Sequence, residues 1–353
     1  MTSTAFFVCP DFNHPSGGTR VIYRFVDTLN SAGVKSAVVH KSRNFRCSWF
    51  ENSTKLVSGR DVTFEKGDLL VVPEWYRTRI PLLAPGLPHL IFNQNAYETF
   101  AGLTFHRGDV ATVVSQDTLG IVAISQNNLE YLKLTFPSLP VHMITLAIDT
   151  ELFRPTPNGK RRIIAFMPRK RLKELNQVLH ILDRRGILGG WELQPIIGVS
   201  EKEVARILSE AGVFLAFNER EGIALPSLEA MASGCLTVGF HGGSGFEYMR
   251  PQISFPIPDG EIASFVLAIE TVLKRWGDAD LADMANRAVD FVRGTYTNIR
   301  EREDVISVFG RALDVIASAE PPVRTMNWKL LDSESRRGND VVRRIADGIT
   351  RRA

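Results

Sequence analysis

Short apolar runs alternate with segments of helical periodicity along most of the chain, and this alternation constrains the fold more than any other feature. Residues 5–9 form a continuous apolar run typical of a strand buried on both faces, and apolar residues then recur at helical spacing from Val21 to Leu29. Alternation of this kind predicts parallel sheets covered by helices. Further strands are expected at 37–39, 69–72, 90–92, 110–114 and 121–124, with a helix at 126–135.

The same pattern restarts after residue 159, which indicates two similar α/β halves. The stretch 149–159 is rich in Pro, Thr and Asn and is expected to connect them. The second half is expected to hold strands at 163–166, 193–197, 213–217 and 235–240, and helices from about Arg171, at 201–211 and at 226–232. A length of 353 residues suits two domains. We therefore predict domains at 1–150 and 151–318, mostly helical beyond Gly260, and a basic C-terminal tail or helix at 319–353.

Charge and cysteine content exclude several classes of protein. The formal net charge of +3 is too small, by itself, for a dedicated nucleic-acid or membrane binder. Residues 319–353 nevertheless carry eight basic and five acidic side chains, which accounts for the whole excess. Cys9, Cys47 and Cys235 lie far apart without C-x-x-C spacing, so we expect no zinc site and a reducing, cytoplasmic location, with peripheral contact at the inner membrane face as an alternative.

The basic tail allows two interpretations. Val341, Ile345 and Ile349 recur at four-residue spacing, which predicts a helix that docks its apolar stripe on one of the domains. The surrounding arginines favour instead a surface that meets an anionic membrane or DNA.

The most informative stretch is 218–247, which reads NEREGIALPSLEAMASGCLTVGFHGGSGFE. An apolar strand leads into a polar loop with Glu221, and Pro226 suits the first turn of a helix that carries Glu229, eight positions after Glu221. This run resembles the E-x7-E region of retaining GT-B glycosyltransferases of family four, whose pattern is roughly E-G-x-x-L-P-x-L-E-A-M-A-x-G.

The resemblance implies an α/β fold of two facing Rossmann-like domains with parallel sheets and a helical C-terminal extension. The first domain would be the acceptor side, and the second would hold most of the nucleotide-sugar donor. It implies transfer of a hexosyl or deoxyhexosyl group from a nucleotide-diphosphate sugar, with retention and without an essential metal or other cofactor. Glu221 would contact the donor sugar, and Glu229 would accept hydrogen bonds from the ribose; a helix-dipole role is the alternative for Glu229. The other residues expected to bind the donor are Gly17, Gly18, Gly222, Ile223, Ala224, Leu225, His241, Gly242 and Gly243.

A second match is the basic stretch 166–173, FMPRKRLK. The family carries an arginine and a lysine here that clamp the donor diphosphate, and the charge of the leaving group calls for fixed cations. We expect Arg169 and Lys173 in these catalytic roles. Because the spacing is narrower than usual, Lys170 and Arg171 remain alternatives to Lys173, and a solvated basic helix start is the plain interpretation of the whole stretch.

Weaker matches to the family lie elsewhere. The loop 16–20, SGGTR, has glycines that let backbone amides approach an anion, although a plain turn explains it equally well. The connection 148–155, IDTELFRP, resembles the family's linker, and 92–100, FNQNAYETF, is loosely similar to a stretch of rhamnosyltransferase-like members. Asp278 and Asp280 have the D-x-D spacing of metal-binding glycosyltransferases, but a helix N-cap is the better interpretation. His241 also suits a plain loop histidine bonded to backbone.

Three functions therefore stand at this point: a glycosyltransferase, a non-catalytic nucleotide-sugar-binding protein, and a GT-B-fold sugar-nucleotide epimerase. For the first, the expected partner is a polysaccharide or lipid-linked glycan acceptor, with a modified DNA base or a protein as alternatives. The sequence leaves open the donor sugar, its base and the oligomeric state.

Overall fold

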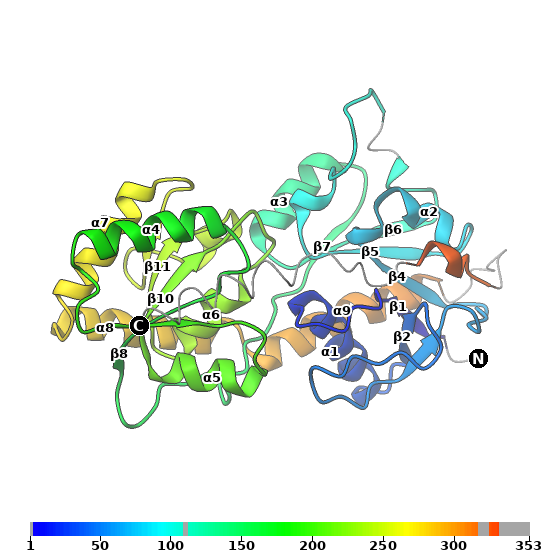
Figure 1. The fold of residues 1–353 in the computed structure, drawn as a ribbon. Coiled ribbons are helices and arrows are strands. Elements are labelled where there is room, and N and C mark those ends of the chain that lie inside the picture. Colours follow the sequence, from blue (N-terminus) through cyan, green and yellow to red (C-terminus); the bar gives the residue numbers. More distant parts are fainter. Residues whose placement is uncertain (1–2, 109–111, 317–324, 332–353) are drawn as a thin grey trace. The chain divides into compact units, whose positions relative to one another are not determined.

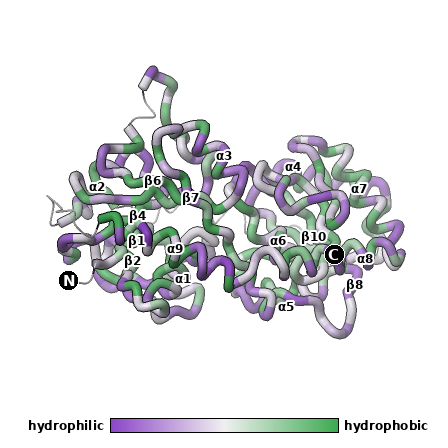
Figure 2. The backbone as a smooth tube through the Cα atoms, turned by 180° about the vertical axis from the view of Figure 1, so that it is seen from behind, coloured by the Kyte–Doolittle hydropathy of each residue, from purple (hydrophilic) through white to green (hydrophobic). Residues whose placement is uncertain are grey.

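The computed structural model describes residues 3–108, 112–316 and 325–331. They form two compact units, each a parallel sheet with helices on both faces (Figure 1). Unit 1 contains the described residues up to Thr145 and those from Ile299 onward, and unit 2 contains Leu146–Asn298. In each unit the central strands are hydrophobic and the surrounding helices and loops are more hydrophilic (Figure 2).

The sheet of unit 1 has seven parallel strands in the order β3-β2-β1-β4-β5-β6-β7. The strands are β1 (Ala5–Val8), β2 (Ser36–His40), β3 (Leu56–Ser58), β4 (Leu69–Pro73), β5 (His89–Asn93), β6 (Thr118–Ala123) and β7 (Val141–Met143). The helices are α1 (Gly17–Ser31), η1 (Glu74–Arg79), α2 (Ile80–Leu83), η2 (Ala96–Glu98), α3 (Gln126–Thr135), α9 (Asn298–Ile316) and η5 (Trp328–Leu330).

The sheet of unit 2 has five parallel strands in the order β12-β11-β10-β8-β9. The strands are β8 (Arg161–Phe166), β9 (Glu192–Pro195), β10 (Ala211–Phe217), β11 (Leu236–Phe240) and β12 (Phe255–Ile257). The helices are α4 (Leu172–Arg184), α5 (Glu201–Glu210), α6 (Leu225–Ala232), η4 (Ser244–Glu247), α7 (Ile262–Lys274) and α8 (Ala279–Thr295).

Alternating side chains of the central strands fill two separate cores in unit 2. Phe214 packs with residues of α5 and α6 on one face, whereas Val213 and Leu215 pack with residues of α4 and α7 on the other. Figure 1 shows these helix pairs on opposite sides of the sheet. Burial on both faces is the reason that β10 is a continuous apolar run in the sequence.

Helix α9 packs within unit 1, against β1 and α1. The Phe309 ring meets that of Phe7 with centroids 4.9 Å apart, and the Arg24 guanidinium pairs with the buried Glu301 carboxylate at 2.5 Å. The sequence alone grouped this helix with residues 151–318, whereas its apolar contacts lie with the N-terminal half of the chain.

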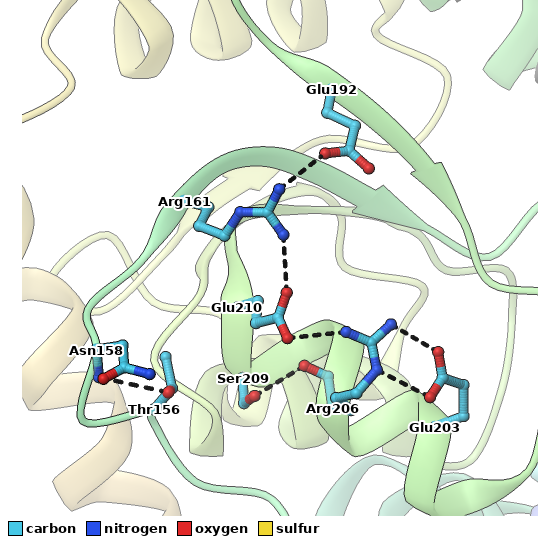
Figure 3. Close-up of polar contacts among 8 residues, drawn as sticks. All are labelled: Thr156, Asn158, Arg161, Glu192, Glu203, Arg206, Ser209 and Glu210. Atoms are coloured by element: carbon cyan, nitrogen blue, oxygen red, sulfur yellow. Dashed lines mark hydrogen bonds and ion pairs between the residues drawn. The ribbon is translucent and has the colours of Figure 1, made fainter.

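A network of ion pairs connects the first residues of β8 and β9 with helix α5 in unit 2 (Figure 3). Arg161, on β8, pairs with Glu192 at 3.4 Å and with Glu210 at 2.9 Å. Arg206 joins Glu210 at 2.8 Å to Glu203 at 2.7 Å. Because the two arginine side chains are more than half exposed, we expect a small net contribution to stability. The network marks the edge of the sheet opposite to the loops considered below.

The expected α/β architecture is confirmed, and several elements differ. The strand expected at 110–114 is wrong for its described part, because 112–114 lie outside any strand. Conversely, β3, β7 and β12 were not expected; each has three residues, too few for a clear apolar run. No helix in the described ranges is long and apolar enough to span a membrane. The tail stripe at Val341, Ile345 and Ile349 lies outside the described residues.

Candidate functional site

The candidate site lies at the carboxyl edge of the unit 2 sheet. β8 and β10 are neighbours in this sheet, but the chain leaves β8 toward α4 on one face and leaves β10 toward α6 on the other. The two loops therefore diverge at the point where the strand order reverses. In doubly wound sheets, ligands bind in the crevice at such a switch point.

An ion pair joins the two diverging loops. Lys170, in the loop after β8, places Nζ 2.6 Å from Oε2 of Glu221, in the loop after β10. The two side chains are 31% and 18% exposed, so both charged groups remain reachable from solvent. The pair places a carboxylate acceptor and a cation side by side at the switch point.

The Glu221 backbone is held by the next loop. Glu221 forms an isolated parallel bridge with Gly243, and its amide donates to the Gly242 carbonyl at 3.3 Å. Gly242 has φ 63°, and a Cβ there would lie 2.3 Å from the Glu219 carbonyl oxygen, so only glycine fits this close approach. Gly243 likewise has positive φ, 81°. The glycine pair thus fixes the position of Glu221.

The rest of the loop after β10 is anchored to the interior. The Ala224 amide donates to the hydroxyl of the fully buried Tyr248 at 3.2 Å, and Gly222 is buried. Ile223 and Leu225 are partly buried and pack against the core beneath α6. Glu229 follows on α6 and is only 8% exposed. The helix and the surrounding core restrict the directions that this carboxylate can take.

The cations of the basic stretch have different surroundings. Arg169 is exposed, and Lys173 is exposed on the first turn of α4, beside a pocket that Glu219 also lines. Arg171, with φ 50°, is 10% exposed, pairs with Asp259, and lies 4.9 Å from the centre of the Phe240 ring. The Arg171 guanidinium thus packs against Phe240 and pairs with Asp259. Lys170, rather than Lys173, lies against Glu221.

His241 carries a defined tautomer. Its Nδ1 accepts a hydrogen bond from the Gly243 amide at 3.4 Å, and its ring lies against that of Phe246 at a tilt of 35°, with centroids 3.7 Å apart. Burial, followed by the nearby Arg171 charge, lowers the pKa of His241 against the opposing effect of Asp259. The imidazole is therefore neutral at pH 7, and its Nε2–H is left as the donor.

The glycine loop of unit 1 lies at the start of α1. Gly17 and Gly18 form its first turn directly after Ser16, whose side chain makes no capping hydrogen bond. That turn contains no acidic residue, and the Gly18 carbonyl accepts from Gln94 Nε2 at 3.3 Å. Backbone amides at such a helix start can hold an anion.

Comparison with known proteins places this architecture. No protein-family model matches the chain. It is 24% identical over 318 residues to an α-1,6-glucosyltransferase of Actinobacillus pleuropneumoniae serotype 7, covering 86% of this chain and 93% of that protein. It is also 30% identical over 153 residues to the MMP α-(1→4)-mannosyltransferase of Mycolicibacterium hassiacum, covering 36% of each.

Solved structures agree along most of the chain. Sucrose-phosphate synthase of Thermosynechococcus elongatus has a TM-score of 0.68 at 12% identity, covering 89% of this chain and 100% of that one. Anabaena HepE, in complex with UDP and glucose, has a TM-score of 0.64 at 11% identity, covering 88% and 100%. The chain has the GT-B fold. At these identities, the likeness establishes the fold.

In this GT-B chain, both aspartates of the D-x-D pair form ion pairs at the start of α8. Asp278 precedes the first residue of α8, and Arg275 pairs with Asp278 at 3.0 Å and with Asp280 at 2.5 Å. Among the described residues, no group of three or more His, Cys, Asp or Glu side chains is arranged to hold a metal ion.

Sequence reasoning missed two contacts of the site. The aromatic partner of His241 is Phe246, which is 67% exposed, and the partner of Arg171 is Asp259, in the loop after β12. A phenylalanine three residues after the glycine pair, within a glycine-rich loop, was a sequence feature that could have indicated this contact. The Asp259 contact had none, because it joins residues 88 positions apart.

Proposed function

We propose that this protein is a retaining glycosyltransferase of the family-four type, which moves a hexosyl group from a nucleoside-diphosphate sugar to an acceptor hydroxyl. The observation that carries the proposal is the Lys170–Glu221 pair at the point between β8 and β10 where the strand order reverses. Glu229 lies eight residues after Glu221, buried on helix α6. The GT-B fold, and relatives named as α-glucosyl- and α-mannosyltransferases, support it.

The donor is proposed to bind along this edge of unit 2. Glu229 accepts hydrogen bonds from the two ribose hydroxyls, because a carboxylate is an acceptor-only group with two oxygens. Glu221 accepts from hydroxyls of the donor sugar. The Gly242–Gly243 turn allows the donor to approach the backbone closely, and His241 offers its Nε2–H to a phosphate oxygen.

The diphosphate leaving group gains negative charge as the bond from its oxygen to the sugar anomeric carbon breaks. Lys170 and Arg169 are the proposed cations that stabilise this charge, with Lys173 as the competing candidate. The acceptor oxygen forms its bond on the same face of the sugar, and its proton passes to the departing phosphate oxygen. No side-chain nucleophile is invoked, and Lys170 exchanges its partner from Glu221 to the phosphate when the donor binds.

The acceptor is proposed to be a polysaccharide or lipid-linked glycan at the cytoplasmic side. The relatives named for α-linkages favour retention, since common hexosyl donors carry an α-linked diphosphate. The cations proposed to stabilise the diphosphate are side chains of the protein, so we expect activity without an added metal ion. The Gly17–Gly18 turn is the proposed contribution of unit 1 to anion binding.

The test is a panel of UDP-, GDP- and dTDP-sugars in which free nucleotide and epimerised sugar are followed separately. We expect nucleotide release that requires an acceptor, that survives EDTA, and that Glu221→Gln reduces while nucleotide affinity is nearly unchanged. Glu203→Gln, on the exposed network of α5, is the matched control. Epimerised sugar without transfer would show an isomerase, binding without turnover a non-catalytic protein, and loss in EDTA restored by Mn²⁺ a metal-dependent enzyme.

A further inference from the structure

An aromatic cluster lies at the carboxyl edge of the unit 1 sheet. Trp75, in η1 directly after β4, is 42% exposed, and its ring meets that of Phe12 edge-on with centroids 5.5 Å apart. Phe12, in the loop after β1, also stacks with His14 at 5.5 Å. Because β1 and β4 are neighbours where the strand order reverses, the cluster lies at the switch point of unit 1.

A solvent-accessible ion pair borders this cluster. Arg77 Nη2 lies 2.9 Å from Glu98 Oε2, and the Arg77 guanidinium carbon is 6.0 Å from the centre of the Trp75 ring. The side chains of Arg77 and Glu98 are 33% and 43% exposed. Glu98 belongs to the 92–100 stretch that sequence analysis singled out and that the donor site does not use. A guanidinium near the exposed indole is thus paired with a carboxylate.

The backbone at Arg77 is strained, and polar atoms around it lack hydrogen-bond partners in the described structure. Arg77 has φ 48° and ψ −127°, a conformation that is unfavourable for a non-glycine residue. Within the described structure, Glu74 Oε2 and Arg77 Nε are buried without a hydrogen-bond partner. Gly102, with φ 78°, brings its loop to the Arg77 guanidinium, where a Cβ would lie 3.4 Å from Nη1. Strain and unpaired polar atoms gather around a single arginine.

We propose that Trp75, Arg77 and Glu98 form a binding subsite for a neutral saccharide, which serves as the acceptor of the transfer. The inference rests on the proposed function and assigns residues of this chain to the acceptor that it names. A pyranose ring has an apolar C–H face that stacks on an indole, and equatorial hydroxyls that donate to a carboxylate and accept from a guanidinium. The Arg77–Glu98 pair is electrically neutral overall.

This chemistry discriminates against an anionic acceptor. A nucleic-acid strand would stack a base on Trp75 but would place phosphates near the Glu98 carboxylate, which already holds Arg77 in an ion pair. A free oligosaccharide and a lipid-linked glycan present the same sugar surface, so both fit the subsite. The experiment therefore uses both forms.

The test measures sugar binding without any donor. Saturation-transfer NMR and tryptophan fluorescence are recorded with isomaltotriose and maltotriose as free sugars, with octyl α-D-glucoside as the lipid-linked form, and with single-stranded DNA. Trp75→Ala and Glu98→Gln should each weaken sugar binding about 10- to 100-fold, whereas Trp75→Phe should keep most of it. Leu134→Ala and Arg43→Ala, at an exposed apolar residue and an exposed ion pair elsewhere in unit 1, are the matched controls.

A second readout separates this subsite from the donor site. In turnover assays, Trp75→Ala and Glu98→Gln should raise the acceptor KM while nucleotide affinity stays at the wild-type value. Equal sugar affinity in these variants and in the controls would overturn the subsite. Absence of sugar binding by the wild-type protein, or DNA binding that Trp75→Ala abolishes, would overturn the saccharide assignment. Neither result would change the nucleotide-sugar panel, which tests the proposed function separately.

Discussion

Replacing Lys170 by methionine should remove most of the transfer activity and little of the stability. The Lys170 ammonium lies 2.6 Å from the Glu221 carboxylate, with side chains 31% and 18% exposed. A pair this open to solvent contributes at most about 1 kcal/mol to folding. For units of roughly this size, such a loss lowers the Tm by about 2–4 °C. Methionine keeps the apolar stem of lysine, so the packing of the loop is preserved.

The expected effect on catalysis is much larger. A fixed group that stabilises developing charge on a leaving group is worth about 100- to 1,000-fold in kcat, or about 2.7–4 kcal/mol. Lys173→Met is the matched control, because Lys173 is exposed on the first turn of α4 three residues away. We expect it to change kcat by no more than about twofold, as ordinary surface substitutions do.

The assay is nucleotide release at saturating donor and acceptor, with nucleotide affinity from calorimetry and a thermal melt of each variant. A wild-type rate for Lys170→Met together with a collapsed rate for Lys173→Met would refute the reasoning. The diphosphate clamp would then follow the spacing expected from the sequence, and the Lys170–Glu221 pair would be a structural contact only.

Four further predictions concern the donor site, two buried groups and the tail. Glu229→Ala should weaken nucleotide binding by about 1.5–3 kcal/mol in calorimetry, and unchanged affinity would remove it from the ribose site. Burial raises the pKa of Glu74 to about 7, so its stability contribution is complete below about pH 4.5 and is lost as the pH rises through 7. Glu74→Gln should accordingly raise the unfolding free energy by about 1–3 kcal/mol at pH 8 and little at pH 5 in urea melts; an equal gain at both would contradict this. Burial lowers the pKa of His89, so stability is lost as the pH falls below about 6.5, and His89→Gln should show a flatter Tm profile from pH 7 to 5. Deleting residues 339–353 should lower the Tm if they form a docking helix; a normal melt with lost salt-sensitive binding to anionic vesicles or DNA would favour the contact surface.

The surroundings of two buried titratable residues of unit 1, His89 and Glu74, determine their pKa values. The His89 ring lies between the Leu87 carbonyl at 3.2 Å and the Thr118 hydroxyl at 2.8 Å, and burial there lowers its pKa. Glu74 is held at the end of β4, where the backbone amides of Gln94 and Asn95 lower its pKa but do not offset burial. Neither environment is readable from the residues next to it in the chain, because the partners come from other strands and loops.

The local pattern of residues by itself determined the α/β architecture, and the resemblance of residues 218–247 to the E-x7-E pattern selected Glu221 and Glu229 as candidates. Strands buried on both faces are mostly apolar, as β10 is, so they stand out in the sequence, as does the amphipathic α1. Glu221 and Glu229 could be selected because the loop and the helix that carry them are adjacent in the chain. Their relative placement needs only a strand, a turn and a helix.

Only the tertiary structure decided which side chains meet across elements. The partner of Glu221 is Lys170, 51 positions away, and that contact depends on the pairing of β8 with β10. Helix α9 belongs to unit 1 because Phe309 and Glu301 find their partners on β1 and α1. Trp75, Arg77 and Glu98 meet because β4 and β5 are adjacent strands. Contacts between residues far apart in the chain are selected by packing and strand order, which local periodicity does not encode.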